Sequence, residues 1–357
     1  MSTKNNTDGG PVYKKIYDGV IEGIKGGSSE KISVNNIAEK YNVTRSTADK
    51  AINMLEQNGW VRRVKRKGTF PVGKISEKIY FINILYDHSS FQNNFLNSYP
   101  FVHIKLIDSI FKSELMSRCN LQLLFMDSSE SVDRKKQKLL SLGTKSGLII
   151  LDPLYGFEDI IKIIKTEHIP YITFTAPDYN INTVFHKHWN GTSKAVDYLI
   201  KSSGRKKILF LSNSRKVELI KPRYEAYLNV LKANNIEFSE KFVFDFNSND
   251  NQDVQNLISI LKTGEIDGIF AASFIVGENV YQILKILDIK MPDEIALIVF
   301  HDTPILSNST PTVTAVKAPL EIIGRTMLEK LVEMIDFGYR DDIRILYEDE
   351  LVVRSST

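Results

Sequence analysis

The spacing of apolar residues near the start of the chain predicts three helices. Apolar residues recur every three or four positions from residue 12 until a pair of glycines, at Val12, Ile16, Val20 and Ile24. This spacing predicts an amphipathic helix that ends at Gly26. Ser33 and Thr44 are suitable N-caps for two further helices, which we expect over Val34–Tyr41 and Arg45–Asn58. Because Asn42 and Val43 make a tight turn between them, these two helices form a candidate helix-turn-helix.

A basic hairpin is predicted directly after the third helix. Residues 60–64 and 69–72 are β-prone, and Gly68 lies in the turn between them. The cations of this hairpin are Arg62, Arg63, Lys65, Arg66 and Lys67. Cations this crowded repel one another unless a polyanion neutralises them, and DNA phosphate is such a polyanion. The position after a helix-turn-helix favours a DNA-contacting wing; a merely solvated charged loop is the alternative.

Charge is unevenly distributed along the chain. The net charge is +3 over 357 residues, but residues 1–73 contain 13 Lys or Arg against 7 Asp or Glu and therefore carry +6. The remaining residues carry −3. A basic head on a mildly acidic body indicates that only the head contacts a polyanion.

From residue 79 onward, short apolar runs alternate with helical patterns. The predicted strands are Tyr80–Tyr86, Leu121–Met126, Gly147–Leu151, Tyr171–Phe174, Lys207–Ser212, Gly268–Ala271 and Ile295–Phe300. The predicted helices include Phe101–Arg118, Asp159–Glu167, Thr192–Ser202, Arg223–Asn234, Val276–Leu287 and Leu320–Met334. Apolar strands joined by helical crossovers predict an α/β fold with doubly wound parallel sheets, and so many strands need two sheets. Ligands of such sheets bind at the C-terminal ends of the strands.

Composition and motifs argue against several classes of protein. No stretch reaches the roughly 18 apolar residues of a membrane span, and Met1–Gly10 lacks the apolar core of a signal peptide, so we expect a cytoplasmic protein. The single Cys119 cannot form an intrachain disulfide, and we expect it to be a buried, inert thiol on an amphipathic helix. Phosphate-binding loops, nucleophile elbows and zinc-protease motifs are absent from the sequence. We therefore expect no enzyme, no cofactor and no metal.

Three segments of the head resemble the GntR-type winged helix: VYKKI at 12–16, NIAEKYNVTRST at 36–47 and GTF at 68–70. The resemblance implies that the third helix enters the major groove of double-stranded DNA while the wing lies along the minor groove. It assigns DNA contacts to Asn35, Thr44, Arg45, Ser46, Thr47, Asp49, Lys50, Arg62, Arg63, Lys65, Arg66, Lys67, Gly68 and Thr69.

Two positions depart from the pattern of the family. The family usually has arginine where this chain has Asp49, and often arginine near Asn35. Because a carboxylate repels phosphate, Asp49 either accepts from a cytosine amino group or pairs with a neighbour such as Lys50. The operator sequence cannot be copied from relatives.

Six segments of the body resemble the periplasmic-binding-protein-like effector domain of LacI-type repressors: NGT at 190–192, YLI at 198–200, GRKKILF at 204–210, RYEAY at 223–227, MPDEIALIVFHDTP at 291–304 and PTVTAV at 311–316. The resemblance implies a head at 1–73, a linker at 74–79 and a two-lobed body at 80–357. It places the chain crossovers near 189, 305 and 336, so that lobe one is 80–189 and 306–335, and lobe two is 190–305 and 336–357. A GntR-type head on such a body is similar to arabinose-responsive repressors.

The resemblance also implies a sugar site between the lobes. Arg223 falls where the family has its sugar-binding arginine, and His301 and Asp302 replace a pair of acidic positions. Ser273 precedes Phe274, which replaces an aspartate; its ring either stacks on the sugar or the polar contact is lost. The alternatives are an ion pair for Arg223 and a turn cap for Asp302. On lobe one the candidates are Asp87, His88, Phe91 and Asp178.

His186 and His188 lie beside Trp189 at a predicted crossover. A spacing of two in an extended segment suits metal ligands, but no third ligand is evident, so we expect them to face solvent or serve in a hinge.

Together, the two resemblances imply a homodimeric transcriptional repressor of carbohydrate genes that binds operator DNA and a small sugar such as arabinose, another pentose or a deoxyhexose. Two rivals stay open: a DNA-binding protein whose body only dimerises or binds a non-sugar ligand, and an enzyme built on a doubly wound sheet.

Overall fold

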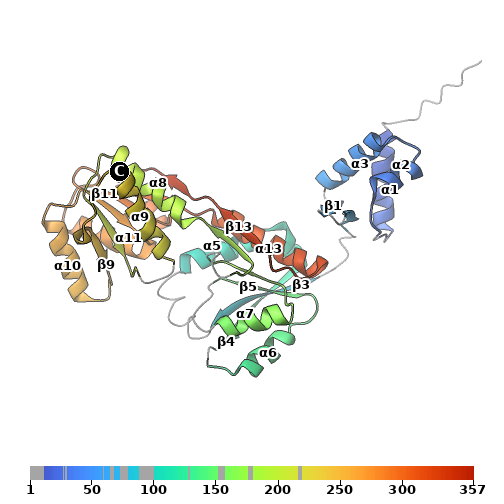
Figure 1. Ribbon diagram of the computed structural model, residues 1–357, viewed down its shortest axis with the longest axis horizontal. Coiled ribbons are helices and arrows are strands. Elements are labelled where there is room, and N and C mark those ends of the chain that lie inside the picture. The colour runs from blue at the N-terminus through green and yellow to red at the C-terminus, as the bar shows by residue number, and fades with distance from the viewer. Residues whose placement is uncertain are drawn as a thin grey trace, which may run out of the picture. The chain divides into compact units, whose positions relative to one another are not determined.

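The computed structural model describes residues 12–26, 28, 30–58, 60–64, 68–72, 79–87, 100–127, 129–151, 157–175, 180–215 and 219–357. The chain forms two compact units, Met1–Lys78 and Ile79–Thr357 (Figure 1). We call the first unit the head and the second unit the body.

The head is a helix-turn-helix followed by a hairpin. Its helices are α1 (Val12–Lys25), α2 (Val34–Lys40) and α3 (Arg45–Gln57), and its antiparallel strands are β1 (Val61–Val64) and β2 (Gly68–Pro71). The predicted helices and hairpin are thereby confirmed. Their shared core contains Ile16, Ile24, Ile37, Ala48, Ala51, Ile52, Leu55 and Val61.

Only one of the two predicted N-caps in the head is made. The Thr44 hydroxyl accepts from the backbone N–H of Thr47 at 3.3 Å, which confirms the cap of α3. Ser33 has the extended backbone of an N-cap, but its side chain makes no capping bond to α2, so that prediction is wrong. The residue before it, Ile32, instead donates its backbone N–H to the carbonyl of Thr69 and forms a short antiparallel bridge beside β2.

The body contains two six-stranded sheets. The first has the order β13-β7-β6-β5-β3-β4 and is parallel throughout. Its strands are β3 (Tyr80–Asp87), β4 (Cys119–Met126), β5 (Ser146–Ile150), β6 (Tyr171–Thr173), β7 (Thr183–His186) and β13 (Arg344–Tyr347). Figure 1 shows these strands with α7 and α13 packed nearby.

The second sheet has the order β14-β12-β11-β10-β8-β9, in which only the edge strand β14 runs antiparallel to its neighbour. Its strands are β8 (Ile208–Ser212), β9 (Val243–Asp245), β10 (Gly268–Ala271), β11 (Ala296–Phe300), β12 (Thr314–Lys317) and β14 (Glu350–Val352). We call the parts of the body built on these two sheets lobe one and lobe two.

Helices cover both faces of each sheet. Lobe one has α5 (Pro100–Phe111), α6 (Val132–Leu140), α7 (Phe157–Thr166) and α13 (Leu320–Phe337), and lobe two has α8 (His188–Lys201), α9 (Lys221–Ala233), α10 (Asn251–Lys262), α11 (Phe274–Ile286) and α12 (Pro304–Ser307). Neighbouring residues of β8 enter different cores, Leu209 with α11 and Phe210 with α8 and α9. Strands that are apolar on both faces are typical of a doubly wound sheet. The α/β class and two-sheet architecture predicted from the sequence are confirmed.

The chain crosses between the lobes three times. β7 of lobe one leads through Lys187 into α8 of lobe two, as predicted. The second and third predicted crossovers, near 305 and 336, are wrong. β12 pairs with β11, so residues up to 317 belong to lobe two, and β13 pairs with β7, so residues 344–347 belong to lobe one. The crossovers therefore lie at 318–319 and 348–349, because the short strands β12 and β13 continue each sheet further than the helical pattern indicated.

The predicted helix 101–118 is two elements. α5 ends at Phe111, and a 3-10 helix, η2 (Glu114–Arg118), begins after Ser113, whose hydroxyl accepts from the N–H of Leu115. Cys119 is therefore the first residue of β4 and not a helical residue, and it is half-buried. Burial raises the pKa of its thiol to about 11, which fits the predicted inert role. Among the described residues, no helix has the length and apolar character needed to span a bilayer.

Candidate nucleic-acid interface and effector site

The exposed face of α3 carries the polar residues expected to meet DNA. Ala48, Ala51, Ile52 and Leu55 are fully buried against the rest of the head. Arg45, Ser46 and Lys50 are exposed on the other side of the helix, and Asn35 of α2 and Thr44 are exposed as well. Thr47 is half-buried, and its hydroxyl lies 2.9 Å from that of Thr44. The contacts between Thr44 and Thr47 therefore fix the first turn of α3, and the exposed side chain of Arg45 can extend outward from it.

Asp49 forms an ion pair with a residue of the wing. Its Oδ1 accepts from the Arg63 guanidinium of β1 at 2.7 Å, and its Oδ2 accepts from the Asn53 amide one turn along α3 at 3.3 Å. Arg63 also lies 3.5 Å from a carboxylate oxygen of Glu56. Of the two alternatives left open for Asp49, the structure shows the pairing with a neighbour, but the neighbour is Arg63 and not Lys50. The ammonium of Lys50 lies over the Tyr13 ring, 4.5 Å from its centroid.

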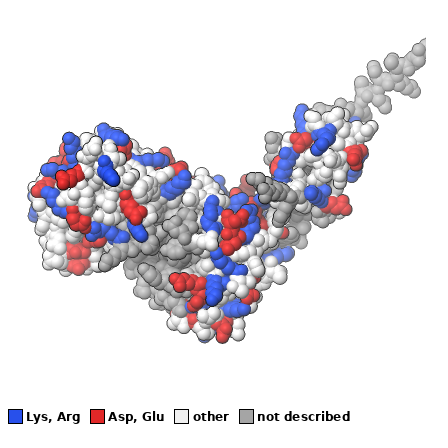
Figure 2. Space-filling view, in the orientation of Figure 1, with Lys and Arg blue, Asp and Glu red and all other residues white. Residues whose placement is uncertain are grey.

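The described residues of the wing differ in how far they are buried. Arg62 is half-buried, and Thr69 is buried with 8% of its surface exposed. Gly68 has a φ of +117° and lies so close to the side chain of Lys31 that a Cβ would collide with it. Lys65, Arg66 and Lys67 fall outside the described residues. In Figure 2 cationic and anionic side chains are interspersed over both units, so the surface charge in this view marks no single large basic patch.

The lobe-one candidates for the effector site lie at or after strand ends. Asp87 is the last residue of β3, which places it at the C-terminal edge of the first sheet. His88, Phe91 and Asp178 fall outside the described residues, as does the side chain of Asp87. These four assignments stay predictions.

Arg223 lies inside lobe two at the start of α9, with 1% of its surface exposed. Its guanidinium carbon is 3.7 Å from the centroid of the Phe300 ring, and its Nη1 donates to the carbonyl of Ala272. Its Nη2 is 3.3 Å from each ring nitrogen of His188. The structure thus brings Arg223 together with the ends of β10 and β11, where ligands of parallel sheets bind.

The segment after β11 is strained and polar. His301 has a φ of +77°, which is uncommon for a residue with a side chain, and such strain concentrates at functional sites. Its ring is buried, and neither ring nitrogen has a hydrogen-bond partner among the described residues. Burial and the neighbouring charge of Arg223 hold its pKa well below the usual range, so the ring is neutral. A neutral imidazole offers one donor and one acceptor to a ligand.

Asp302, Ser273 and Phe274 have defined structural partners. Asp302 accepts from Arg354 at 2.7 Å through Oδ2, whereas its Oδ1 has no hydrogen-bond partner among the described residues. The Ser273 hydroxyl caps α11 by accepting from the N–H of Val276. The Phe274 ring lies 6.1 Å from the ring of Phe101 in lobe one and 6.2 Å from that of His301, centroid to centroid. Phe274 is thus at the contact between the lobes.

His186 and His188 belong to the same buried cluster as Arg223. Their exposed fractions are 2% and 6%, so the expectation that they face solvent is wrong, while their place at the first crossover agrees with a hinge. The carboxylate of Asp349, at the third crossover, lies 2.7 Å from Nδ1 of His186. No group of three or more metal-ligating side chains was found among the residues the structure describes.

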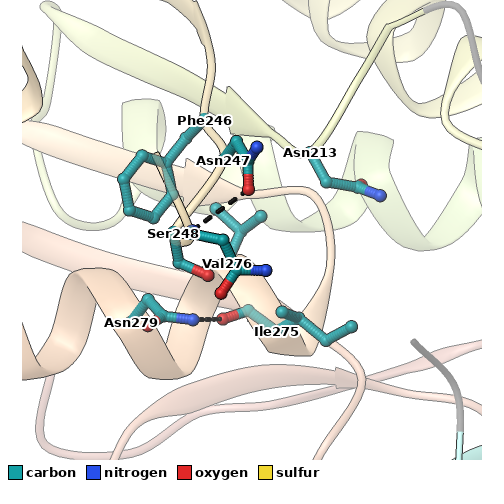
Figure 3. Close-up of a pocket in the computed structure, with 8 residues that line it drawn as sticks. Asn213, Phe246, Asn247, Ser248, Ile275, Val276 and Asn279 are labelled. Atoms are coloured by element: carbon teal, nitrogen blue, oxygen red, sulfur yellow. Dashed lines mark hydrogen bonds between the residues drawn. The ribbon is translucent and has the colours of Figure 1, made fainter. Parts of the chain in front are cut away.

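A pocket of about 210 Å³ opens on the same edge of the second sheet (Figure 3). Asn213 follows β8, Asn247 to Asn249 follow β9, and Ile275, Val276 and Asn279 come from the start of α11. The Asn247 side chain accepts from the N–H of Asn249, and the Asn279 amide donates to the carbonyl of Ile275. Sequence reasoning missed these residues, although asparagines that directly follow buried strands are a usable signal.

Comparisons with known protein families cover both units. A family described as bacterial regulatory proteins, gntR family, matches residues 12–70. A periplasmic binding protein-like domain matches residues 196–357. The first match covers α1 to β2, and the second covers most of lobe two and the end of lobe one.

The curated relatives are regulators. An arabinose metabolism transcriptional repressor of Halalkalibacterium halodurans is 21% identical over 375 residues, which span 100% of this chain and 97% of that protein. The HTH-type transcriptional regulator CelR of Thermobifida fusca is 22% identical over 213 residues, 58% of this chain and 62% of that protein.

Solved structures share the fold. A complex of the transcriptional regulator CelR with cellobiose has a TM-score of 0.62 at 19% identity and covers 92% of this chain and 100% of that chain. A lac repressor dimer bound to operator has a TM-score of 0.62 at 16% identity and covers 79% of this chain and 95% of that chain.

The two family matches and the two-unit fold agree with one another. Both matched families are regulatory or ligand-binding, and neither is a family of enzymes. The chain is a DNA-binding transcriptional regulator that joins a gntR-family winged helix-turn-helix to a periplasmic-binding-protein-like domain.

Proposed function

We propose that this regulator is a repressor of carbohydrate genes and that a small neutral sugar, such as arabinose, another pentose or a deoxyhexose, binds between the lobes beside Arg223. The observation that carries the proposal is the group of buried polar atoms at the C-terminal edge of the second sheet. His301 and Asp302 keep acceptors or donors that no described residue satisfies. Buried polar groups without partners are costly, and ligand hydroxyls would satisfy them.

The chemistry of the edge fits a polyol. A guanidinium engages vicinal hydroxyls with a pair of donors, a neutral imidazole donates and accepts once each, and carboxylate and amide oxygens accept from hydroxyls. The pocket in Figure 3 is lined by four asparagines together with Phe246, Ile275 and Val276. Apolar side chains with amide groups beside them suit a sugar ring, which has C–H faces and a polar edge. The relatives named for arabinose and the structure with cellobiose support the same ligand class.

The head is proposed to bind a pseudo-palindromic operator as half of a homodimer. Two-fold symmetric dimers present two heads to two symmetric half-sites. The edge strand of lobe one offers an apolar surface for such a dimer: Leu123 and Phe125 are 54% and 37% exposed on one face of β4. The related lac repressor structure is a dimer on operator. The protein would work in the compartment that holds the operator, the cytoplasm.

Calorimetry of the full chain against pentoses, deoxyhexoses and their phosphates tests the ligand. We expect at least one sugar to bind, and Arg223→Met to weaken that binding by tenfold or more, about 1.4 kcal/mol. Arg205→Met is a matched control, because Arg205 is a half-buried arginine of the same lobe that precedes β8, at the opposite edge of the sheet, and donates to the carbonyl of Pro292. If no sugar gives heat, or if both variants bind as the wild type does, the sugar site is wrong and a body that dimerises or binds another ligand is favoured.

A further inference from the structure

The first crossover, at Lys187, is hydrogen-bonded and ion-paired to the segment that leads into the third crossover, at 348–349. The N–H of Lys187 donates to the carbonyl of Tyr347 at 2.9 Å, and its ammonium pairs with Glu348 at 2.6 Å. His186, which precedes Lys187, contacts Asp349, which follows Glu348, and this second contact is buried. The exposed ion pair contributes little to stability, whereas the buried contact joins two charged or titratable groups away from water.

Three hydrogen-bond contacts in series lead from Asp349 into lobe two. Oδ1 of Asp349 lies 2.7 Å from Nδ1 of His186. Nε2 of His186 lies 3.1 Å from Nε2 of His188, and Nδ1 of His188 lies 3.2 Å from the carbonyl oxygen of Leu219. Both imidazoles therefore use both of their nitrogens.

The number of protons decides how these contacts are made. Two neutral imidazoles carry two ring protons, but three contacts between electronegative atoms need three protons. The carbonyl oxygen of Leu219 can only accept, so His188 must donate to it from Nδ1. The Nε2 of a neutral His188 then carries no proton and must accept from Nε2–H of His186. The contact between His186 and Asp349 therefore needs a third proton.

Burial indicates where the third proton resides. The pKa of His188 is held well below its usual range by burial and by the charge of Arg223, so His188 is neutral. The Asp349 side chain is fully buried, and among the described residues His186 is the one side chain recorded as its ionic partner. A buried carboxylate needs a cation beside it. This places the proton between His186 and Asp349, as an imidazolium facing a carboxylate.

Arg223 packs on the end of this series. Its Nη2 is equally far, 3.3 Å, from both ring nitrogens of His188, so it lies over the face of the imidazole and not in line with one lone pair. The plane of the guanidinium is therefore set by the His188 ring on one side and the Phe300 ring on another. Among the described residues, two further titratable groups lie beside the pair. The ring centroid of His301 is 5.8 Å from that of His186, and the ammonium of Lys194 donates to the backbone carbonyl of Asp349 at 2.9 Å.

We propose that Asp349, His186, His188 and the backbone carbonyl of Leu219 form a relay of three hydrogen bonds and three protons through which the crossovers orient Arg223. Asp349 and the two histidines are positioning residues: they act on the ligand through the guanidinium. A ligand that moves Arg223 away from His188 then changes the contacts of the His188 and His186 rings, and through them the contact between the first and third crossovers. The proposal rests on the proposed function only in assigning Arg223 to the effector.

Nitrogen NMR of the full chain labelled with ¹⁵N-histidine tests the relay without any ligand. The chain has six histidines, and His186→Asn and His188→Asn assign two of the signals. At pH 7 we expect His186 to carry protons on both nitrogens and His188 to be neutral with its proton on Nδ1. Two neutral rings, or a proton on Nε2 of His188, would overturn the relay. This wild-type measurement decides the matter even where a variant fails to fold.

Asp349→Asn tests the direction of the effect. Without the carboxylate, His186 is expected to become neutral, and the guanidinium resonances of Arg223, assigned with Arg223→Lys, are expected to change from restricted to free rotation. Asp197→Asn is the control, because Asp197 lies on the same helix as His188 but pairs with Lys201 at the surface. Unchanged histidine and arginine signals in Asp349→Asn would contradict the proposal. Absence of sugar binding would contradict the proposed function alone.

Discussion

At the scale of single residues, neutral histidines are buried where the two lobes meet. His188 and His301 lie beside Arg223, and His103 of α5 lies in lobe one with 8% of its surface exposed. Burial lowers the pKa of all three, that of His103 to about 4. A ring that stays neutral in the folded protein resists protonation that the unfolded chain accepts.

The stability of the body is therefore expected to fall in mild acid. The unfolded chain binds a proton at His103 below pH 6.5 and the folded chain only below about 4, so this contribution is complete above pH 6.5 and is lost as the pH falls through that window. A shift of this size corresponds to about 3 kcal/mol. Urea unfolding between pH 4 and 7 measures it, and His103→Leu should flatten the slope. An equal slope in the variant would show that His103 does not titrate as described.

The cations of the wing are predicted to differ in their contribution to DNA binding. Arg63 is already compensated by Asp49 and Glu56, so Arg63→Ala should leave the salt dependence of DNA affinity nearly unchanged. Replacing Arg66 and Lys67 with alanine should reduce the slope of log K against log salt by about 2, because two phosphate contacts are lost. Fluorescence anisotropy with duplexes selected from random DNA measures both. A large slope change for Arg63→Ala alone would show that its pairs open on DNA.

The residue types of the site were predictable only in part. Arg223 and His301 could be named because each follows a strand in a segment that resembles the LacI-type body. The role of His186 could not be, because its partner Asp349 is 163 residues away in the sequence. Asp49 was ambiguous for the same reason, since its partner Arg63 lies on another element.

At the scale of elements, continuous apolar runs were read correctly and short strands with a charged residue or a histidine were missed. The predicted strand 268–271 agrees with β10, whereas β7, β9, β12, β13 and β14 were not predicted. Each of these missed strands has three or four residues and includes a charged residue or a histidine, so no continuous apolar run marks it. The crossover error has this origin, because β12 and β13 fix which lobe their neighbours join.

The packing of α11 on β11 depends on one glycine. A Cβ at Gly277 would collide with the side chain of Val299. Gly277→Ala should therefore destabilise the body by about 1–3 kcal/mol, as overpacked cores do. Ile286→Ala on the same helix is the control, because Ile286 is 80% exposed. Thermal unfolding compares the two; an unchanged midpoint for Gly277→Ala would mean that α11 moves away at little cost.

At the scale of the whole molecule, the head and the body divide the work. The head presents the exposed first turn of α3 and the wing, and the body gathers Arg223, His301 and the asparagine-lined pocket at one sheet edge. The three crossovers connect the two lobes near that edge. A ligand there can change the relation of the lobes, and a coupling of about 1–3 kcal/mol would change operator affinity roughly 5–150-fold.

The most direct test of the account is the affinity of the full chain for a DNA duplex selected from a random pool, measured by fluorescence anisotropy with and without each pentose and deoxyhexose. The account predicts that at least one sugar changes the affinity at least fivefold, and that Arg223→Met keeps the DNA affinity but loses the response. An affinity indifferent to every sugar, or a response that survives in Arg223→Met, would contradict it.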